Sequence, residues 1–339
     1  MANWLSGYTT RKKITIDKSK IDSTLTDFPV LVKLTSSNFD FSKANSDGYD
    51  IRFTSADGTT LLKYERERHD STNKLAEYWV KIPSISSTAN TIFYLYYRVE
   101  DTDDGADPTN VWDSKFKGVW HMKDLTTSTI EDSTSNNNDG TKKAANEPIE
   151  ADGKIARAQS FDGNNDYISV PENNVLDPTI ITIEAWVKIS SAPTNNGNIV
   201  EKGENKGYRF RINNDQTVSW FDRGGAVNHL KTTTKVSLNS WTYIVVMGDS
   251  SGLKIYLNGV LDKSGGSAYG GPNTSSPLCI GACKEFNEYF NGLIDEVRIS
   301  SVARSSAWIK ASYYSGNNSL VSYGNEEGID NAVFFGCNF

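Results

Sequence analysis

Apolar and polar residues alternate in short runs along most of the chain, as in residues 11–16, 49–54 and 77–82. A period of two places successive side chains on opposite faces of a strand. Turn dipeptides such as Asp47-Gly48 and Asn258-Gly259 separate these runs, and the second predicts a two-residue hairpin. The pattern therefore predicts antiparallel β-strands at residues 11–16, 28–34, 49–54, 61–65, 77–82, 91–98, 166–170, 180–189, 208–212, 241–247 and 253–257.

A helical pattern is confined to residues near 303–313, where Ala307, Trp308 and Ala311 could share one face. The 339 residues exceed one ordinary domain. We therefore predict an all-β chain with two β-sandwich domains, at residues 1–110 and 111–327, and an apolar tail at residues 328–339.

Composition and charge exclude several classes of function. The net charge of -7 gives no electrostatic case for binding nucleic acid, and no apolar run is long enough to cross or insert into a membrane. The 8 Trp, 16 Tyr and 14 Phe favour pleated sheets. The first residues do not resemble a signal peptide, so we expect either a processed form or release within a virus particle.

Two features of the sequence are open to a metal-site or disulfide interpretation. Cys279, Cys283 and Cys337 are too few for a disulfide framework; we expect packing residues, although Cys279 and Cys283 could pair. The acidic segment 100–110 places Asp101, Asp103 and Asp107 at nearly alternate positions, which invites calcium. A solvated linker is favoured, because an EF-hand loop would need flanking helices.

The second half of the chain carries a series of motifs at residues 118–122, 131–141, 160–167, 183–187, 241–243, 255–259 and 290–299. In content and order they resemble laminin-G-like domains of the concanavalin A-like lectin/glucanase superfamily, over about residues 116–327. The resemblance implies a jelly-roll sandwich.

A second set of motifs lies in the first part of the chain, at residues 4–16, 49–53, 77–83 and 92–97. These pieces resemble a small β-sandwich family of unknown function, DUF2341. This resemblance implies a smaller antiparallel sandwich and carries no chemistry.

The segment 131–141 is the best metal candidate, because calcium prefers the oxygens of Asp, Asn and backbone carbonyls. The lectin-like resemblance implies that this loop meets the late strand around residue 295 at a structural calcium site. It nominates Asp132, Asn137, Asp139 and Asp295. The alternative is a turn that uses Asn and Gly for left-handed backbone. Thr134 stands where relatives often carry Gly.

The sequence argues against catalysis. Glucanases of this superfamily carry paired carboxylates in a Glu-x-Asp-x-x-Glu pattern, because retaining cleavage needs two carboxyl groups about 5 Å apart. No such pattern occurs here: Glu184 stands alone in its strand, and Asp295 and Glu296 should point to opposite faces. None of the three histidines lies in a recognisable catalytic context. We predict that the protein is not an enzyme.

Sugar recognition typically combines an aromatic platform with polar groups on loops. Trp220 and Arg223 lie beside a Gly turn, with Tyr208 in the neighbouring strand and Tyr269 in a long Gly/Ser/Asn loop. We nominate these four residues for ligand binding. The alternative is that Trp220 is a core residue of its strand.

We therefore expect a non-catalytic carbohydrate-binding or adhesion protein outside the cell, or on a virion surface as a phage tail, fibre or head-decoration protein. Its partner would be a surface glycan or glycoconjugate. The alternative is an architectural module that binds no sugar. The apolar tail either completes a sheet of its own chain or adds a strand to another structural subunit.

Overall fold

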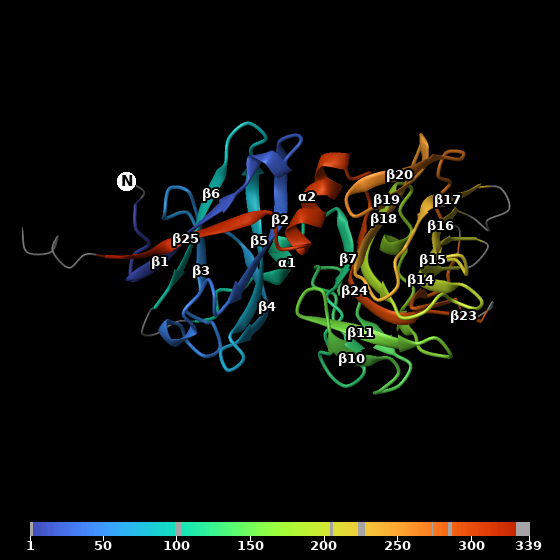
Figure 1. The fold of residues 1–339 in the computed structure, drawn as a ribbon, viewed down its shortest axis with the longest axis horizontal. Helices are drawn as coiled ribbons and strands as arrows, with labels where there is room; N and C mark the ends of the chain where they lie inside the picture. Colours follow the sequence, from blue (N-terminus) through green and yellow to red (C-terminus); the bar gives the residue numbers. More distant parts are fainter. Residues whose placement is uncertain are drawn as a thin grey trace, which may run out of the picture. The chain divides into compact units, whose positions relative to one another are not determined.

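A computed structural model describes residues 3–98, 103–203, 206–222, 228–272, 274–283 and 287–329. The chain divides into two compact units (Figure 1). Unit 1 combines Met1–Val111 with the segment that starts at Asn317, and unit 2 is Trp112–Gly316. Both units consist of antiparallel sheets, as the alternating pattern predicts.

The described strands of unit 1 form a four-stranded sheet in the order β25-β1-β6-β3 and a three-stranded sheet in the order β2-β5-β4. Side chains that alternate along these strands, such as those of Phe28, Val30 and Val32, are fully buried. The elements are β1 (Thr10–Ile16), β2 (Leu25–Thr35), β3 (Arg52–Ser55), β4 (Tyr64–Asp70), β5 (Leu75–Ile85), β6 (Thr91–Tyr97), β25 (Val321–Gly328), the short helix α1 (Pro108–Val111) and the 3-10 turns η1 (Lys18–Lys20) and η2 (Phe41–Lys43).

The last strand corrects the predicted domain boundary. We assigned residues up to 327 to the second domain, but β25 pairs antiparallel with β1, from Thr10 opposite Gly328 to Ile16 opposite Val321 (Figure 1). Unit 1 is therefore built from both ends of the chain. Residues 321–328 complete a sheet of their own chain, and residues 330–339 of the predicted tail lie outside the described residues.

The described strands of unit 2 form two eight-stranded sheets. One follows the order β10-β11-β24-β13-β18-β19-β20, with β7 also paired to β24, and the other follows β17-β16-β15-β14-β21-β12-β9-β8. The bounds of the first sheet are β7 (Phe116–Trp120), β10 (Ile149–Asp152), β11 (Arg157–Asp162), β13 (Ile181–Ile189), β18 (Thr242–Asp249), β19 (Gly252–Leu257), β20 (Val260–Gly265) and β24 (Asn291–Ser300).

The second sheet contains β8 (Thr129–Ile130), β9 (Gly140–Lys142), β12 (Ile168–Val170), β14 (Gly197–Lys202), β15 (Tyr208–Ile212), β16 (Thr217–Asp222), β17 (Asn228–Lys235) and β21 (Leu278–Ile280). Unit 2 also has a small hairpin of β22 (Ala282–Cys283) and β23 (Glu288–Tyr289), the 3-10 turn η3 (Asn174–Leu176) and helix α2 (Ser306–Gly316).

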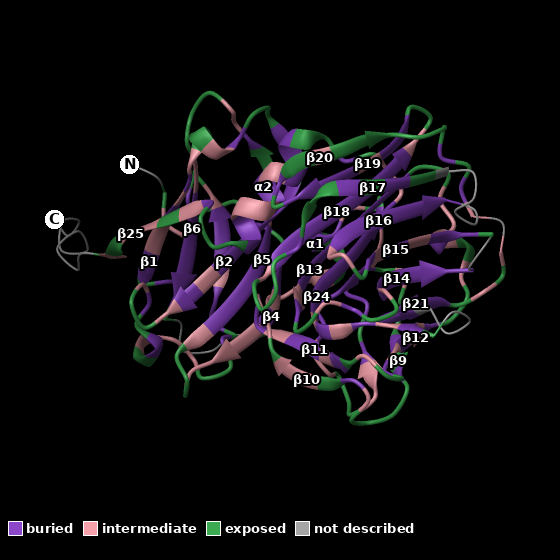
Figure 2. Ribbon diagram, turned by 45° about the vertical axis from the view of Figure 1, so that its right-hand side comes forward, coloured by how far each residue is buried: buried purple, intermediate pink, exposed green. Residues whose placement is uncertain are grey.

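One continuous apolar core holds the two sheets of unit 2 together. It takes residues from both sheets, among them Ile183 and Val246 from the first and Phe210 and Val218 from the second. The central strands are drawn almost wholly in the buried colour in Figure 2. Burying apolar side chains contributes roughly 25 cal/mol per Å², so this core is the main stabilising element of the unit.

Several local expectations can be compared with these elements. The hairpin at Asn258-Gly259 joins β19 to β20, and both turn residues have positive φ. The helix predicted near residues 303–313 is α2, shifted toward the C-terminus, with Ala307, Trp308 and Ala311 buried as one face. The strand expected at 61–65 instead begins at Tyr64.

The acidic segment is attached to unit 1 by ion pairs. Asp104 accepts two hydrogen bonds from Arg66, at 2.6 and 2.7 Å, and Asp107 pairs with Lys63 at 2.6 Å. Of the three aspartates considered for calcium, Asp107 is engaged by Lys63, Asp103 is exposed, and Asp101 lies outside the described residues. Cys279 is buried in β21, whereas the side chain of Cys283 and all of Cys337 are outside the described part. In the part that the structure describes, no helix is long and apolar enough to span a bilayer.

Candidate functional site

Asp132 holds the turn that follows β8. Its Oδ1 accepts hydrogen bonds from the backbone N–H groups of Val119 and Thr134, at 2.9 and 3.0 Å. Its Oδ2 accepts from the Thr134 hydroxyl at 2.8 Å and from the Asn138 N–H at 2.9 Å. Burial raises the pKa of this carboxyl, against the opposing effect of these hydrogen bonds. Four protein donors thus already surround the carboxylate.

The other three predicted calcium ligands have separate roles. Asp139 accepts a hydrogen bond from the Asp132 N–H at 2.8 Å, and Asn137 is exposed with φ of 52°, as the turn alternative expects. Asp295 is fully buried in β24 and accepts from the Ile155 N–H at 2.9 Å. Among the described residues, the carboxylates of Asp132, Asp139 and Asp295 do not gather within 4.8 Å. The donor set does not fit one shared calcium site, and calcium binding stays a prediction.

The nominated aromatic residues form no exposed platform among the described residues of this structure, and their role in ligand binding stays a prediction. The structure brings Tyr208, Trp220 and Tyr269 together, but as part of the core of unit 2. Trp220 is 0 % exposed and stacks on Tyr269, with ring centroids 6.1 Å apart and planes at 22°. Strand alternation points Trp220 inward, so no ligand reaches it in this conformation. Arg223 lies outside the described residues.

A polar pocket of about 190 Å³ lies where three loops of unit 2 meet. The loops follow β11, join β13 to β14, and lead from the β22–β23 hairpin into β24. Amide, carboxylate and phenol groups dominate its lining, which comprises Asp162, Gly163, Asn164, Ser191, Ala192, Pro193, Thr194, Asn195, Asn196, Asn287, Tyr289 and Asn291. Several of these side chains are exposed or partly exposed, so the pocket is open to ligands.

Asp162 organises the first loop of the pocket. Its carboxylate accepts from the backbone N–H of Asn164 at 2.8 Å and from that residue's side-chain amide at 3.0 Å. Burial would raise its pKa, but these hydrogen bonds hold the pKa below its usual value, so the carboxylate is charged at neutral pH. Gly163 has φ of 79° and approaches Asn291 so closely that a Cβ there would lie 2.9 Å from the Asn291 side chain.

Glu288 fixes the position of the β22–β23 hairpin on β14 and β15. Its carboxylate accepts from the amide of Asn196 at 2.9 Å and from that of Asn198 at 3.0 Å. It also pairs with Arg211, and it lies 3.7 Å from a guanidinium nitrogen of Arg209. Because Asn196 lines the pocket and Asn287 and Tyr289 flank Glu288, this buried carboxylate sets the shape of the pocket wall.

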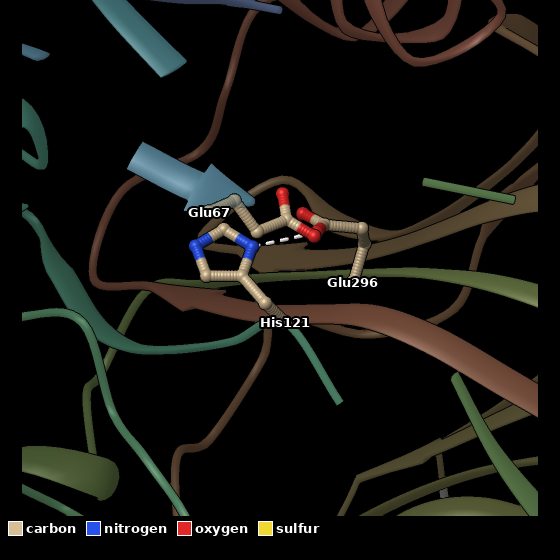
Figure 3. Close-up of side chains that lie close together, drawn as sticks. All are labelled: Glu67, His121 and Glu296. Carbon is tan, nitrogen blue, oxygen red and sulfur yellow. Dashed lines mark hydrogen bonds and ion pairs between the residues drawn. The ribbon is translucent and has the colours of Figure 1, made fainter. Parts of the chain in front are cut away.

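The buried charges on β24 form a different cluster. Nδ1 of His121 and Oε1 of Glu296 lie 2.6 Å apart (Figure 3). Arg298 also pairs with Glu296. Burial would raise the pKa of Glu296, but the charges of His121 and Arg298 hold it below its usual value. Tyr243 donates a hydrogen bond to Glu184, another carboxylate considered for catalysis. Both carboxylates are thus engaged by neighbouring side chains.

Sequence reasoning quoted two of the pocket's segments as family motifs but assigned no ligand role to them. The signal that could have found the pocket is the density of Asn and Asp in short loops, at residues 162–166 and 194–198. Such loops are equally typical of turns. Only the fold brings three of them to one end of the sandwich.

Unit 2 is thus an antiparallel sandwich with a polar pocket between its end loops. Residues 162–310 match the model of the concanavalin A-like lectin/glucanases superfamily (Laminin_G_3), and residues 47–141 match a domain of unknown function (DUF2341). Both expected resemblances are confirmed. The DUF2341 match runs on to residue 141, through residues that lie in β7, β8 and β9 of unit 2.

Solved structures give distant likenesses, and no curated protein matches the chain. The binding domain of Paraclostridial Mosquitocidal Protein 1 is 17 % identical with a TM-score of 0.49, over 62 % of this chain and 53 % of that one. Domain 4 of the arabinanase AbnA from Geobacillus stearothermophilus, solved with arabinotriose, is 20 % identical with a TM-score of 0.47, over 58 % and 97 %. A botulinum neurotoxin type C structure is 14 % identical with a TM-score of 0.46, over 60 % and 51 %. This chain thus spans about half the length of the two toxin chains.

Proposed function

We propose that unit 2 is a non-catalytic carbohydrate-binding domain whose site is the polar pocket between its end loops. The observation that carries the proposal is the lining itself, in which side-chain amides and a carboxylate converge beside Tyr289. The match to a lectin superfamily supports the same function. A location outside a cell or on a virion surface, as an adhesion protein, belongs to this proposal.

The chemistry of the lining suits sugar hydroxyl groups. A side-chain amide can donate to one hydroxyl and accept from the next, and a carboxylate can accept from two neighbouring hydroxyls. The ring of Tyr289 offers an apolar surface for sugar C–H groups. Among the described lining residues the only charged side chain is that of Asp162, so we expect neutral glycans to bind better than acidic ones.

The same lining argues against hydrolysis. Glycosidic cleavage requires two carboxyl groups that flank the bond. The described lining supplies one, Asp162, and its carboxylate accepts hydrogen bonds from Asn164. A site with one carboxylate can orient a sugar but lacks the second group that cleavage needs.

The test is a glycan array with the full chain, run in calcium and in chelator, followed by calorimetry on the best ligand. Asn164→Ala and Asn287→Ala should each weaken binding about tenfold, which corresponds to about 1.4 kcal/mol. Asn214→Ala is the matched control, because Asn214 is an exposed asparagine of unit 2 that does not line the pocket. A silent array with folded protein would favour the architectural alternative. Unchanged affinity in both pocket variants would place the site elsewhere.

A further inference from the structure

The indole of Trp220 is a buried donor that makes no hydrogen bond. Trp220 is 0 % exposed, and within the part of the chain that the structure describes its Nε1 has no hydrogen-bond partner. Tryptophan N–H groups normally find an acceptor when they are buried, because an unpaired buried donor destabilises the fold. In contrast, Nε1 of Trp120, which is equally buried, donates to the Asn138 carbonyl at 2.8 Å.

The ring that stacks on Trp220 comes from a loop, whereas Tyr208 of β15 contacts the indole with its ring tilted at 45° and its centroid 6.2 Å away. Tyr269 lies in the connection between β20 and β21, within a segment that we call the strap, residues 265–272. Gly265 and Gly266 precede the tyrosine and Gly270 and Gly271 follow it, and three of these four glycines have positive φ. A glycine pair on each side gives the backbone rotational freedom that other residues lack.

Backbone N–H groups of the strap donate hydrogen bonds to the rest of unit 2. The Tyr269 N–H donates to the Asp249 carbonyl at 2.8 Å, and the Gly270 N–H donates to the side-chain carboxylate of Asp222 at 2.7 Å. The ring also lies directly on β18, since a Cβ at Gly248 would be 2.7 Å from it. A single aromatic side chain on a glycine-hinged strap thus fills the space over Trp220.

We propose that Trp220 is a second carbohydrate site, which the chain's own Tyr269 occupies in this structure. When the strap swings out, the flat face of the indole is uncovered for the C–H face of a neutral sugar ring. The free Nε1–H then donates to a sugar hydroxyl or ring oxygen, an acceptor that Tyr269 does not supply. The site lies at the end of β16, whereas the polar pocket lies at the start of β14, so the two are separate.

This inference rests on the proposed function only for the chemical class of the ligand. Binding at Trp220 requires the open strap, and apparent affinity falls with the fraction of open molecules. Tyr269→Ala should therefore strengthen binding at least tenfold, whereas Tyr269→Phe, which keeps the covering ring, should leave affinity unchanged. Trp220→Phe combined with Tyr269→Ala should abolish the gain.

The experiment is NMR of the full chain labelled with ¹⁵N in the Trp indoles, with cellotriose, maltotriose and arabinotriose as probes. Trp220→Phe assigns the Trp220 signal. We expect at least one probe to shift this signal in Tyr269→Ala at a tenfold lower concentration than in Tyr269→Phe. A Trp220 signal that no probe moves in folded Tyr269→Ala protein would overturn the proposal.

Hydrogen exchange in the unaltered chain gives a measurement that needs no variant to fold. An opening strap should make the Trp220 indole proton exchange at least 100-fold faster than that of Trp120. Equal rates would also overturn the proposal. Asn164→Ala separates the two sites. If this variant loses binding on the array and no probe shifts the Trp220 signal, only the strap proposal is overturned. If a probe shifts the Trp220 signal and Asn164→Ala leaves binding unchanged, only the pocket proposal is overturned.

Discussion

Single carboxylates in unit 2 hold the loops around them by accepting hydrogen bonds from the loop backbone. Asp132 accepts four hydrogen bonds from the turn that surrounds it, and Asp162 holds the first loop of the pocket in the same manner. A carboxylate that satisfies several backbone donors removes the cost of leaving them buried and unpaired. Asp and Asn also bind calcium, so only the contacts of each residue show whether it is a metal ligand or an acceptor that holds a turn.

Asp132→Ala should lower the free energy of unfolding by about 2–3 kcal/mol, because it leaves buried donors without an acceptor. We expect the same loss in calcium and in chelator, since these donors already surround the carboxylate. Thermal denaturation under both conditions measures it, with Asp152→Ala as a control at an exposed carboxylate. A loss that appears only in calcium would instead establish the predicted metal site.

At the scale of elements, the strand β25 connects the two sheets of unit 1. Its Tyr323 hydroxyl donates to the Lys33 carbonyl at 2.8 Å and accepts from the Lys33 N–H at 3.0 Å. Lys33 belongs to β2, in the sheet opposite the one that β25 completes. Burial raises the pKa of this tyrosine well above its usual value, so the hydroxyl remains a neutral donor.

Tyr323→Phe should lower the free energy of unfolding of unit 1 by about 1–3 kcal/mol, because it leaves both backbone groups of Lys33 without this partner. Urea denaturation followed by tyrosine and tryptophan fluorescence measures the change. Tyr49→Phe is the control, since Tyr49 is an exposed tyrosine of the same unit. An equal effect in both variants would show that the contact between the sheets contributes nothing specific.

The β22–β23 hairpin depends on Glu288 in a comparable way. Glu288→Ala removes the carboxylate that faces two arginines and two asparagines, and it should cost about 3 kcal/mol of stability. Glycan affinity should fall with it, since Asn196 and Tyr289 lose their support. Glu147→Ala breaks an exposed pair with Lys143 and should cost less than about 1 kcal/mol. Calorimetry with and without ligand compares the two variants, and similar losses of stability would contradict the role of Glu288 in holding the hairpin.

At the scale of the whole molecule, ion-paired carboxylates make stability depend on pH. The hydrogen bonds from Arg66 hold the pKa of Asp104 below its ordinary value of 3.8. A group whose pKa is lower in the folded state contributes stability above the unfolded value, and that contribution is lost as pH falls through the folded pKa. Asp57 and Asp215 are depressed in the same direction by their hydrogen bonds.

We therefore expect the chain to lose stability below about pH 4, and Asp104→Asn to remove part of that loss. The difference in unfolding free energy between the wild type and this variant should be constant above pH 5 and should shrink as pH falls below 3.8. Chemical denaturation at a series of pH values measures it. Asp103→Asn is the control, because Arg52 donates to the backbone carbonyl of Asp103, which the substitution leaves in place. A difference that does not change with pH would contradict the role of the Arg66 pair.

The sequence by itself determined the all-β class, the resemblance to two families, the hairpin at Asn258-Gly259 and the position of helix α2 within a few residues. These properties are local, because alternation, turn residues and family motifs can be read within short windows. The tertiary structure alone decided that β25 returns to β1, that Trp220 lies beneath Tyr269, and that three Asn-rich loops enclose one pocket. Each of these joins residues far apart in the chain. Strand order and register set such contacts, and a short window of sequence contains neither.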